Sequence, residues 1–433
     1  MKHGAKGGTR VPDNQRRRTD VVVIGAGMAG LACAADLIRA GRSVRVLEAA
    51  DAVGGRMRTD RHEGFLLDRG FQVFNTAYPQ VKRRIDLRGL RLRPFTPGAL
   101  VRTEDTTLRF TDPSRQPGAV ADLLPGRLAP GRDLLALGLL TARDMLGPVA
   151  GLKRRPDRTT LTALADAGIS PGLVERFFRP FLSGVFLEDE LETSSRFFHL
   201  VWRSMLRGTL CLPSAGIGAV PAQLADGLPP DTVRLETPVA ELTDDGVRGE
   251  EGTEWPADTV VVATGPRAAA RLLPGLDVPA TRTVTTYYHA APAPPLREPT
   301  LLVDTRRRFL NTCVISEVVP GYAPAGRSLV STSVLGPELP GREATLRADL
   351  ADAYGESTGA WEPLATYTIE DALPAMPPPW PLSRPTRTGP GRYVCGDHRA
   401  TGSVQGALAS GTRAARDVLA ADRARDAAEA RHD

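Results

Sequence analysis

The chain has 433 residues, a hydrophobic content of 42% and a formal net charge of +5. This length suits two or three domains with a sizeable core. The basic residues are mostly arginines, with only four lysines, and they do not alternate with aromatic residues as in single-strand binders, so we expect no nucleic-acid partner. Four cysteines without a C-x-x-C spacing argue against a zinc site and a disulfide framework.

The first segment, residues 1–18, is predicted to be a flexible basic tail. Its Arg16-Arg17-Arg18 run precedes an apolar stretch and imitates a twin-arginine export signal. The same apolar stretch supplies the strand, turn and helix described next, so cleavage there would destroy the fold. We therefore expect a cytoplasmic protein. No apolar run reaches about 18 residues, so no transmembrane helix is expected.

A strand, a glycine-rich turn and a helix follow the tail. Residues 20–24 are apolar, residues 25–30 read Gly-Ala-Gly-Met-Ala-Gly, and residues 31–40 carry helical spacing. This is the dinucleotide-binding fingerprint. In it Gly25 allows a sharp turn, Gly27 leaves room for a pyrophosphate, and Gly30 lets helix and strand pack closely. The helix directs its N-terminal amides, around Met28 and Ala29, at the phosphates.

A second strand, Val44–Leu47, ends in Glu48, which lies 18 positions after Gly30. An acid near this spacing accepts hydrogen bonds from ribose hydroxyls. Six residues beyond Glu48 comes the doublet Gly54-Gly55 and then Arg56. Together these features predict a dinucleotide cofactor.

The stretches Val46–Ala49 and Val53–Thr59 closely resemble the flavin-containing amine oxidoreductase superfamily, which includes monoamine oxidases, protoporphyrinogen oxidase and phytoene desaturases. The resemblance implies FAD as the cofactor. It places Ala49 beside the ribose-binding acid, and it lays Gly54, Gly55 and Arg56 along the pyrophosphate. An arginine can donate two charge-assisted hydrogen bonds to phosphate oxygens.

Later segments resemble the parts of that family that return to the cofactor. Val233–Leu242 alternates like a strand, and within it Val239 corresponds to the valine whose backbone pairs with the adenine edge. Asp258–Gly265 reads as a buried parallel strand. Arg392–Val394 predicts another strand, after which residues 402–407 open a helix that runs to about residue 421.

The resemblance also implies contacts with the flavin ring. Gly396 and Asp397 would reach the ribityl–phosphate region, and Val404 would offer its backbone amide to the ring at a helix N-terminus, where the dipole favours an anionic reduced flavin. The chain would pass beside the isoalloxazine at Gly70, Phe71 and Gln72. The segment about forty residues before Ser403 contains no cysteine, so we expect the FAD to be non-covalent.

The predicted fold class is α/β, with a discontinuous Rossmann-like FAD-binding domain and an α+β substrate-binding domain. The FAD-binding domain comprises residues 19–75, 212–265 and 391–421; the substrate-binding domain comprises 76–211 and 266–390; and 422–433 is a charged tail. Within the substrate-binding domain the first block is helical and the second is richer in strands. The expected helices are Arg132–Leu146, Leu161–Ala167, Gly172–Phe178 and Ser194–Leu206, and the expected strands are Val284–His289, Thr300–Val303 and Leu329–Val334.

The chain departs from the marks of amine-oxidising members. Ser403 stands where those enzymes often place an aromatic cage residue, and Thr283 aligns with their lysine. Mostly apolar or small residues replace them. We therefore expect hydride transfer from a substrate C–H bond to flavin N5, in a desaturase- or dehydrogenase-type reaction on a small apolar substrate, with an unknown electron acceptor. Such a step needs positioning more than a strong base.

No catalytic residue is assigned from the sequence. His398 follows the Gly-Asp pair and could act as a base near the ring, although a loop histidine bonded to backbone is the plainer interpretation. His289 reads as a strand-end histidine, and His199 as part of a helix-packing cluster. Tyr287 and Tyr288 alternate across a strand, so at most one of them faces a substrate.

Three alternatives stay open. The first is an amine or amino-acid oxidase whose cage uses other residues. The second is a non-enzymatic binder of the Rab GDP-dissociation-inhibitor type, which shares this fold. The third is an enzyme at a membrane surface, in which the stretch Leu134–Leu146, with Arg132 before it and Arg143 near its end, lies at the interface. For that stretch an ordinary core helix is the default expectation.

Overall fold

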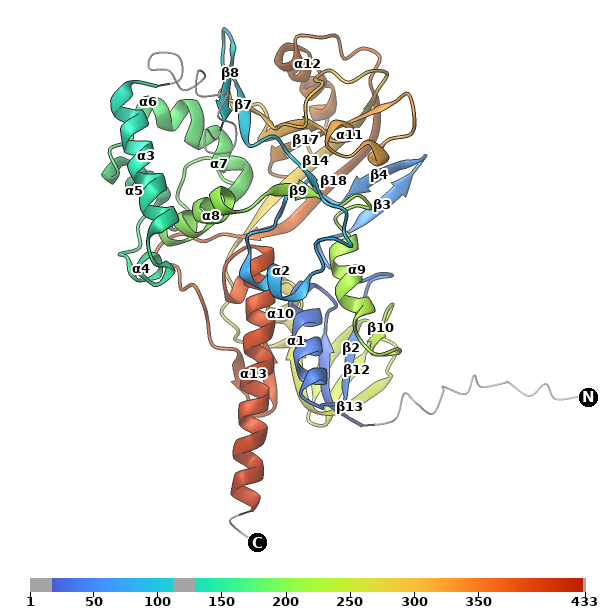
Figure 1. The fold of residues 1–433 in the computed structure, drawn as a ribbon. Helices are drawn as coiled ribbons and strands as arrows, with labels where there is room; N and C mark the ends of the chain where they lie inside the picture. The colour runs from blue at the N-terminus through green and yellow to red at the C-terminus, as the bar shows by residue number, and fades with distance from the viewer. Residues whose placement is uncertain (1–17, 112–128, 431–433) are drawn as a thin grey trace, which may run out of the picture.

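The computed structural model describes residues 18–111 and 129–430. Residues 1–17 of the predicted basic tail and residues 431–433 of the predicted charged tail lie outside the described residues. Two large sheets organise the molecule, one of eight strands and one of seven, and helices surround them (Figure 1). The predicted α/β fold class is confirmed.

The first sheet gathers strands that lie far apart in the sequence. Its order is β10-β2-β1-β13-β12-β11, and β20 pairs with β13 and with β19. The pairs β1–β2, β1–β13, β2–β10 and β13–β20 are parallel, as expected for valine-rich strands covered on both faces. The strands are β1 Thr19–Ile24, β2 Val44–Leu47, β10 Val233–Arg234, β11 Val239–Thr243, β12 Gly246–Gly249, β13 Glu254–Val262, β19 Arg387–Gly389 and β20 Arg392–Val394.

One predicted strand of this sheet is divided. The expected strand Val233–Leu242 splits into the parallel β10 and the antiparallel β11. Glu236 between them has a φ of 50°, in the left-handed region, and Pro238 has no N–H to donate to a ladder. These two residues turn the chain, so that β11 continues as a hairpin with β12.

Two helices cover one face of this sheet and pack against each other (Figure 1). They are α1, Met28–Arg39, and α13, Val404–Glu429. A Cβ on Gly411 of α13 would lie 2.1 Å from the carbonyl oxygen of Ala29, so only glycine permits this approach. Two shorter helices complete this half of the molecule: α9 Ala219–Asp226 and α10 Pro266–Leu272.

The second sheet is mainly antiparallel, with the order β18-β14-β17-β16-β15-β7-β8. Only the β7–β15 pair is parallel. On β14, Tyr287 and Tyr288 enter different hydrophobic clusters, as the predicted alternation requires. The strands are β7 Gly98–Arg102, β8 Thr107–Thr111, β14 Thr281–Ala291, β15 Leu302–Asp304, β16 Asn311–Val314, β17 Ser328–Leu335 and β18 Glu362–Pro374, and the helices beside them are α11 Ile315–Val318, η4 Pro320–Tyr322 and α12 Arg342–Tyr354.

A helical block packs beside the second sheet around a cluster that includes Phe177, Phe178, Phe198 and Trp202. The four predicted helices of this region are present, with ends shifted by one or two residues, except that Gly172–Phe178 forms a short α-helix followed by a π-helical turn. The helices are α3 Gly131–Leu146, α4 Val149–Arg154, α5 Thr160–Asp166, α6 Pro171–Leu173, η3 Val174–Phe178, α7 Arg179–Phe186 and α8 Ser195–Arg207.

The default expectation for the stretch Leu134–Leu146 is only half correct. In α3, Leu140 is buried, but Leu135, Leu139 and Leu146 are 65%, 63% and 85% exposed. The helix therefore has one face in the core and a second apolar face in solvent.

Short elements connect the two large sheets. A hairpin and a three-stranded sheet bring residues 59–75 alongside residues 210–212. Within the described ranges, no helix combines the length and the apolar character needed to cross a membrane. The connecting elements are β3 Thr59–His62, β4 Phe65–Asp68, β5 Phe74–Asn75, α2 Pro79–Arg84, β6 Arg93–Pro94, β9 Leu210–Leu212 and η5 Asp397–Arg399.

Candidate cofactor-binding site

The predicted glycine loop lies at the carboxyl end of β1 and turns sharply into α1. Gly25 has a φ of 103°, and its N–H donates to the carbonyl of Leu47 over 2.7 Å. A Cβ on Gly30 would lie 2.0 Å from the carbonyl oxygen of Gly25. The first and third glycines are therefore required by the fold itself, whatever the loop binds.

Gly27 differs from these two glycines because its surroundings are open. A Cβ there would meet no atom within 4 Å. The backbone of Gly27 forms an isolated parallel β-bridge with Gly54. The helix α1 begins here without a side-chain cap and without an acidic residue in its first turn, where Met28 and Ala29 lie. Uncapped amides at a helix start favour an anion such as a phosphate.

Glu48 lies at the end of β2, beside the loop. Its Oε2 accepts the N–H of Ala26 over 2.7 Å, and its Oε1 accepts the N–H of Ala50 over 2.9 Å. A carboxylate has about four acceptor positions, so two stay available to ribose hydroxyls. The carbonyl of Glu48 accepts the N–H of Thr237, which brings the start of β11 and the buried Val239 to the same edge.

Arg56 and Asp397, far apart in the sequence, form an ion pair at 2.7 Å. Arg56 also donates to the carbonyl of Ala372 over 2.7 Å, and its own carbonyl accepts the side-chain amide of Gln72 over 2.8 Å. The Asp397 carboxylate is almost fully buried, whereas the Arg56 side chain is 37% exposed. The predicted residues thus meet at one place, although the pairing itself was not predicted.

Glycines on both sides of Arg56 give the backbone conformations that other residues rarely adopt. Gly54 and Gly55 have φ values of 118° and 59°, and a Cβ on Gly54 would lie 2.4 Å from the carbonyl oxygen of Met57. Gly70, with a φ of 82°, precedes Phe71, whose N–H donates to Thr286 Oγ1 of β14 over 3.3 Å. This contact joins the predicted flavin segment to the second sheet.

The start of α13 faces the same region. Ser403 is its N-cap, and the Ser403 Oγ accepts the N–H of Gly406 over 3.1 Å, so Val404 is the first helical residue. Ser403, which the family resemblance aligns with an aromatic cage position, has its hydroxyl engaged by the helix end. Among the described residues the α13 start therefore offers backbone amides and no aromatic wall of its own.

His398 is completely buried, yet neither ring nitrogen has a hydrogen-bond partner in the described part of the chain. Burial lowers the pKa of His398 to about 4, so the ring is neutral at physiological pH. Its backbone N–H donates to Asp397, and a Cβ on Gly396 would lie 2.5 Å from the ring. A buried polar group without a partner is costly, so two orphaned nitrogens here point to a missing ligand group. The plainer interpretation from the sequence, a loop histidine whose ring bonds to the backbone, is not what the structure shows.

Two further histidines singled out from the sequence, His289 and His199, each have a carboxylate partner. His289 Nε2 lies 3.0 Å from Glu343 of α12, and burial lowers the pKa of His289. His199 Nδ1 lies 2.6 Å from Asp144 of α3. Both pairs join one element to its neighbour, which agrees with their interpretation as structural residues.

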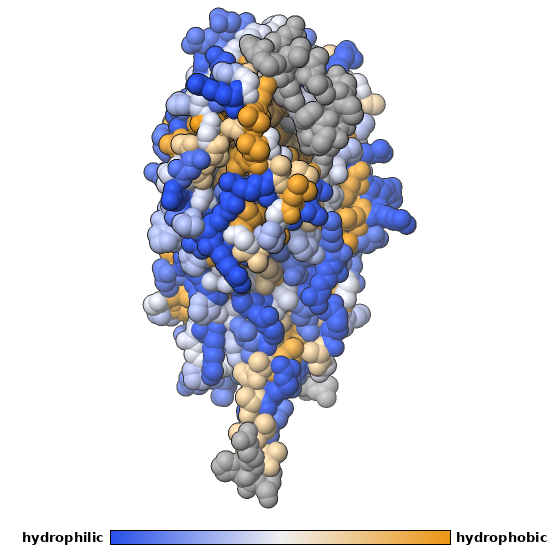
Figure 2. Space-filling view, turned by 60° about the vertical axis from the view of Figure 1, so that its left-hand side comes forward, coloured by the Kyte–Doolittle hydropathy of each residue, from blue (hydrophilic) through white to orange (hydrophobic). Residues whose placement is uncertain are grey.

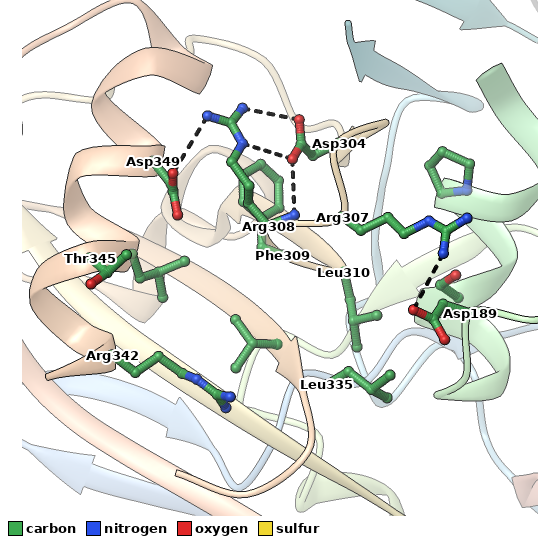
Figure 3. A pocket seen from close by; sticks show the side chains of 14 residues that line it. Asp189, Asp304, Arg307, Arg308, Phe309, Leu310, Leu335, Arg342, Thr345 and Asp349 are labelled. Carbon is green, nitrogen blue, oxygen red and sulfur yellow. Dashed lines mark hydrogen bonds and ion pairs between the residues drawn. The ribbon is translucent and has the colours of Figure 1, made fainter. Parts of the chain in front are cut away.

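A separate hollow of about 250 Å³ lies between α7, α12 and the 307–310 turn (Figure 3). Most of its charged side chains pair with one another: Arg308 with Asp304 at 2.9 Å and with Asp349 at 3.6 Å, and Arg307 with Asp189 at 3.7 Å. Arg342 donates instead to the carbonyl of Pro337 over 2.6 Å. None of the predicted cofactor residues lines it.

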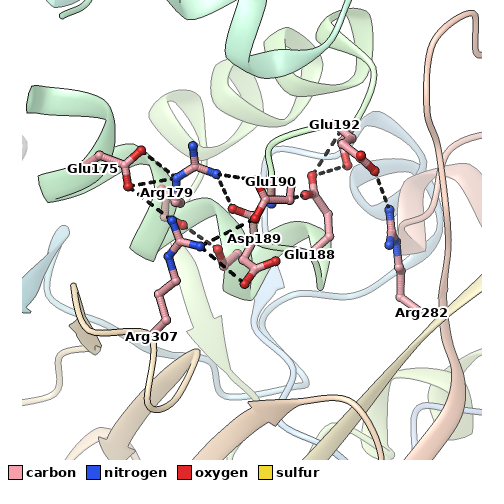
Figure 4. Close-up of polar contacts among 10 residues, drawn as sticks. Glu175, Arg179, Glu188, Asp189, Glu190, Glu192, Arg282 and Arg307 are labelled. Carbon is pink, nitrogen blue, oxygen red and sulfur yellow. Dashed lines mark hydrogen bonds and ion pairs between the residues drawn. The ribbon is translucent and has the colours of Figure 1, made fainter. Parts of the chain in front are cut away.

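The ion-pair network beside this hollow continues onto the helical block (Figure 4). Glu175 accepts from Arg179 over 2.8 Å and from Arg307 over 3.4 Å, which ties α7 to the 307–310 turn. Because these charges neutralise one another, we interpret the hollow as a packing feature of the second sheet.

The residues present fit a phosphate-bearing flavin cofactor on three observations of this structure. The space at Gly27 is open to a ligand, α1 begins without a cap, and the ring nitrogens of His398 are orphaned beside the Arg56–Asp397 pair.

Comparison with known proteins agrees with this geometry. The family described as flavin containing amine oxidoreductase matches residues 28–419. A hydroxysqualene dehydroxylase of Rhodopseudomonas palustris is 31% identical over 93% of this chain and 99% of its own length. A coproporphyrinogen III oxidase of Propionibacterium freudenreichii is 27% identical over 61% of this chain and 60% of its own length.

The fold is shared with solved structures. That of cyclohexylamine oxidase from Brevibacterium oxydans matches with a TM-score of 0.62 at 19% identity, over 93% of this chain and 99% of that one. The family match covers all of the second sheet, the helical block and every strand of the first sheet except β1, and it favours the enzymatic interpretation over a binder of the GDP-dissociation-inhibitor type. The chain therefore belongs to the flavin-containing amine oxidoreductase family and is a flavin-dependent oxidoreductase.

Proposed function

We propose that the chain binds FAD non-covalently and accepts a hydride from a substrate C–H bond at flavin N5, in a desaturase- or dehydrogenase-type reaction on an apolar substrate. The observation that carries the proposal is the likeness to hydroxysqualene dehydroxylase, which extends over nearly the whole of both chains. Hydroxysqualene is a long hydrocarbon with one hydroxyl group. Because the likeness to an enzyme named for this compound covers nearly the whole chain, it supports an apolar substrate.

The same proposal gives each predicted residue a part in holding FAD. Gly25, Gly27 and Gly30 with the start of α1 would hold the pyrophosphate, and Glu48 would accept the ribose hydroxyls. The remaining predicted contacts, from the adenine to the flavin ring, are assigned to Ala49, Val239, Gly54, Gly55, Arg56, Gly70, Phe71, Gln72, Gly396, Asp397 and Val404. Residues 19–75, 212–265 and 391–421 would then form the FAD-binding domain, and residues 76–211 and 266–390 the substrate-binding domain.

FAD, when bound, supplies a ring that can take up or release a hydride. The protein's part is to exclude water and to position the substrate carbon. His398, neutral and unpartnered, would satisfy a polar group of the cofactor or substrate from its buried position. Ser403 would keep the start of α13 ordered through its cap, without forming an amine cage.

The first test is an absorbance spectrum of the purified protein before and after acid precipitation. Peaks near about 375 and 450 nm that leave with the supernatant would support bound, non-covalent flavin. Mass spectrometry of the supernatant would then distinguish FAD from FMN. A colourless protein that takes up no added FAD would contradict the proposal.

The substrate class is tested by anaerobic mixing, with the flavin absorbance near about 450 nm as the readout. We expect an apolar polyene to bleach the oxidised protein, and benzylamine and amino acids to leave it unchanged. Replacement of a C–OH by a C–H consumes a hydride, so reoxidation of the chemically reduced protein by hydroxysqualene would contradict the proposed direction of hydride transfer and favour a reductive dehydroxylation. Bleaching by amines alone would favour an amine or amino-acid oxidase. Repeating the turnover with oxygen and with a quinone would identify the electron acceptor.

We also propose the cytoplasm as the location of the protein. All four cysteines are free and buried. A hydrogen bond with Cys395 is the first cause of the raised pKa of Cys33, and burial raises the pKa values of Cys211 and Cys313. Unreactive thiols of this kind suit a reducing compartment.

A further inference from the structure

The outer surface of α3 and α4 carries apolar and cationic side chains without exposed carboxylates. Leu135, Leu139 and Leu146 lie at helical spacings of four and seven residues, so they share one face of α3, and they are 65%, 63% and 85% exposed. Val149, at the start of α4, extends this face and is 38% exposed. Single exposed leucines are ordinary, but an aligned row on one helix is not.

The charges around this row are positive. Arg132 lies at one end of α3, and Lys153 and Arg154 lie at the end of α4; all three are exposed. They form no ion pair with a carboxylate in the described part of the chain. We call the exposed side chains of Arg132, Leu135, Leu139, Leu146, Val149, Lys153 and Arg154 the α3–α4 face.

Both carboxylates of the segment 131–155 point inward. Asp133 is completely buried and accepts the N–H and the hydroxyl of Ser170, at 2.9 and 2.6 Å. Asp144 is also completely buried and pairs with His199 at 2.6 Å. The fold thus hides the negative charges of this segment and leaves its positive charges on the solvent side.

The inner side of these helices is firmly packed. Trp202 Nε1 of α8 donates to Thr141 Oγ1 over 3.3 Å, and Arg203 donates to the carbonyls of Met145 and Gly147 over 2.7 and 3.0 Å. The exposure of the leucines is therefore not due to a loosely held helix. Figure 2 brings this side of the molecule forward and shows hydrophobic groups among strongly hydrophilic ones.

The helical block behind this face reaches the candidate cofactor site. Its core cluster includes Leu140 of α3, and also Met376 and Trp380. The sulfur of Met376 accepts the N–H of Gly402, and Trp380 Nε1 donates to the carbonyl of Ala400 over 2.9 Å, next to the start of α13. One block therefore carries the α3–α4 face outside and borders the candidate site inside.

We propose that the α3–α4 face docks the protein on the surface of an anionic lipid bilayer. The leucines enter the boundary between head groups and acyl chains, and the cations contact lipid phosphates. Charge complementarity selects this partner, because the face has only positive charges around its apolar row. The inference goes beyond the proposed function, and it predicts binding in the absence of any substrate or electron acceptor.

Vesicle flotation with the flavin-loaded protein tests the proposal. We expect the wild type to float with vesicles of phosphatidylcholine containing about one third phosphatidylglycerol, and to stay at the bottom with pure phosphatidylcholine. Replacing Leu135, Leu139 and Leu146 by Gln should weaken binding at least about a hundredfold. Replacing Arg132, Lys153 and Arg154 by Gln should weaken it about fivefold for each charge, and high salt should do the same to the wild type.

A matched control is Leu339→Gln, because Leu339 is 48% exposed on the α12 side of the molecule. This variant should float like the wild type. If the leucine variants float unchanged, or if the wild type ignores anionic vesicles, the proposal is overturned. If the wild type does not float and is a dimer in light scattering that the leucine variants convert to monomers, the face is a contact between copies of the chain, and the proposal is also overturned.

A second measurement guards against misfolding of the triple variant. Leu139→Cys, labelled with an environment-sensitive fluorophore, should shift to the blue when anionic vesicles are added, because the probe enters the acyl boundary. The same label at position 339 should not shift. Since neither readout uses turnover, failure here is separable from failure of the proposed function, which the flavin spectrum tests.

Discussion

At the scale of single residues, the most informative contact is the ion pair between Arg56 and Asp397. It joins the segment after the glycine loop to the segment before α13 and buries the carboxylate. Removing one partner of a buried pair leaves the other charge without compensation, which costs more than the pair contributes. The pair therefore organises the place where the flavin ring and phosphates are proposed to meet.

We predict that Arg56→Ala loses flavin. The variant exposes the carboxylate of Asp397 to the bound phosphates without a compensating cation, so the flavin content after purification should fall at least about tenfold. The ratio of flavin to protein absorbance measures this. Arg327→Gln removes an exposed pair with Glu362 and should retain the wild-type ratio. Equal flavin content in the two variants would contradict a role for Arg56 in the site.

His398 should make the stability of the flavin-free protein depend on pH. Burial lowers its pKa to about 4 in the folded state, below the ordinary value of 6.5. The unfolded chain therefore binds more protons in this range, and stability is present above about pH 6.5 and is lost as the pH falls toward 4. Between pH 7 and pH 4.5 the free energy of unfolding should fall by about 2 kcal/mol more in the wild type than in His398→Gln, which lacks the titrating ring. Denaturant titrations at several pH values measure the difference, and parallel curves would refute it.

Asp68 should make the stability of the protein depend on pH in the opposite direction. Burial raises the pKa of its carboxyl to about 6, against bonds from Thr59, Ile217 and Tyr322 that lower it. The folded state keeps the proton longer, so this contribution is full below about pH 4 and is lost as the pH rises through 6. In Asp68→Asn, stability should therefore decline less between pH 4 and 6 than in the wild type. An unchanged decline would show that the carboxyl is already ionised at pH 4.

At the scale of elements, Gly411 is required for helix packing, whereas Gly27 is proposed to be required only for ligand binding. A methyl group on Gly27 meets nothing within 4 Å, whereas one on Gly411 would lie 2.1 Å from a backbone oxygen of α1. Gly27→Ala should leave the thermal midpoint of the flavin-free protein within about 1 °C, because it adds no clash, and yet weaken flavin binding by occupying the phosphate space.

Gly411→Ala should destabilise the flavin-free protein by about 1–3 kcal/mol, because α13 must move away from α1. Gly138→Ala, on the exposed part of α3 where a methyl group also meets nothing, should stabilise it by about 0.5–1 kcal/mol. Chemical denaturation of the three flavin-free variants measures their free energies of unfolding and so ranks their stabilities. A destabilised Gly27→Ala would show that this position, too, is required for folding.

At the scale of the whole molecule, the cofactor is expected to hold together segments from both ends and the middle of the chain. A ligand that binds only the folded state at about 100 times its dissociation constant adds about 2.7 kcal/mol of stability. We therefore expect a higher thermal midpoint when FAD is added to the flavin-free protein. FMN should add less, because it lacks the adenosine that Glu48 and Val239 are proposed to contact. Equal shifts with the two flavins would contradict those two assignments.

Much of the fold follows from local sequence pattern. The glycine loop, the acid after β2 and the strand β1 are fixed by short-range features, such as the positive φ at Gly25 and the valine run of β1. These requirements act within about ten residues, so the printed sequence predicts them. Periodicity also located α3, α5 and α8 to within one or two residues.

Other features depend on contacts between distant segments. The split of the strand Val233–Leu242 follows from the turn at Glu236, which a pattern of alternating side chains does not reveal. The burial of His398 without a partner is decided by the packing around it, since nothing beside it in the sequence marks a buried histidine.

By itself the sequence determined the cofactor class, the flavin family and the order of the elements, because a phosphate-binding turn is a local structure with a local signature. Only the tertiary structure decided which partners meet. It paired Arg56 with Asp397, and it turned Asp133 and Asp144 inward while the leucines of α3 stayed in solvent. Helical spacing is the same for a buried row and an exposed one, so the neighbouring helix α8, and not the pattern, determines which face of α3 is covered.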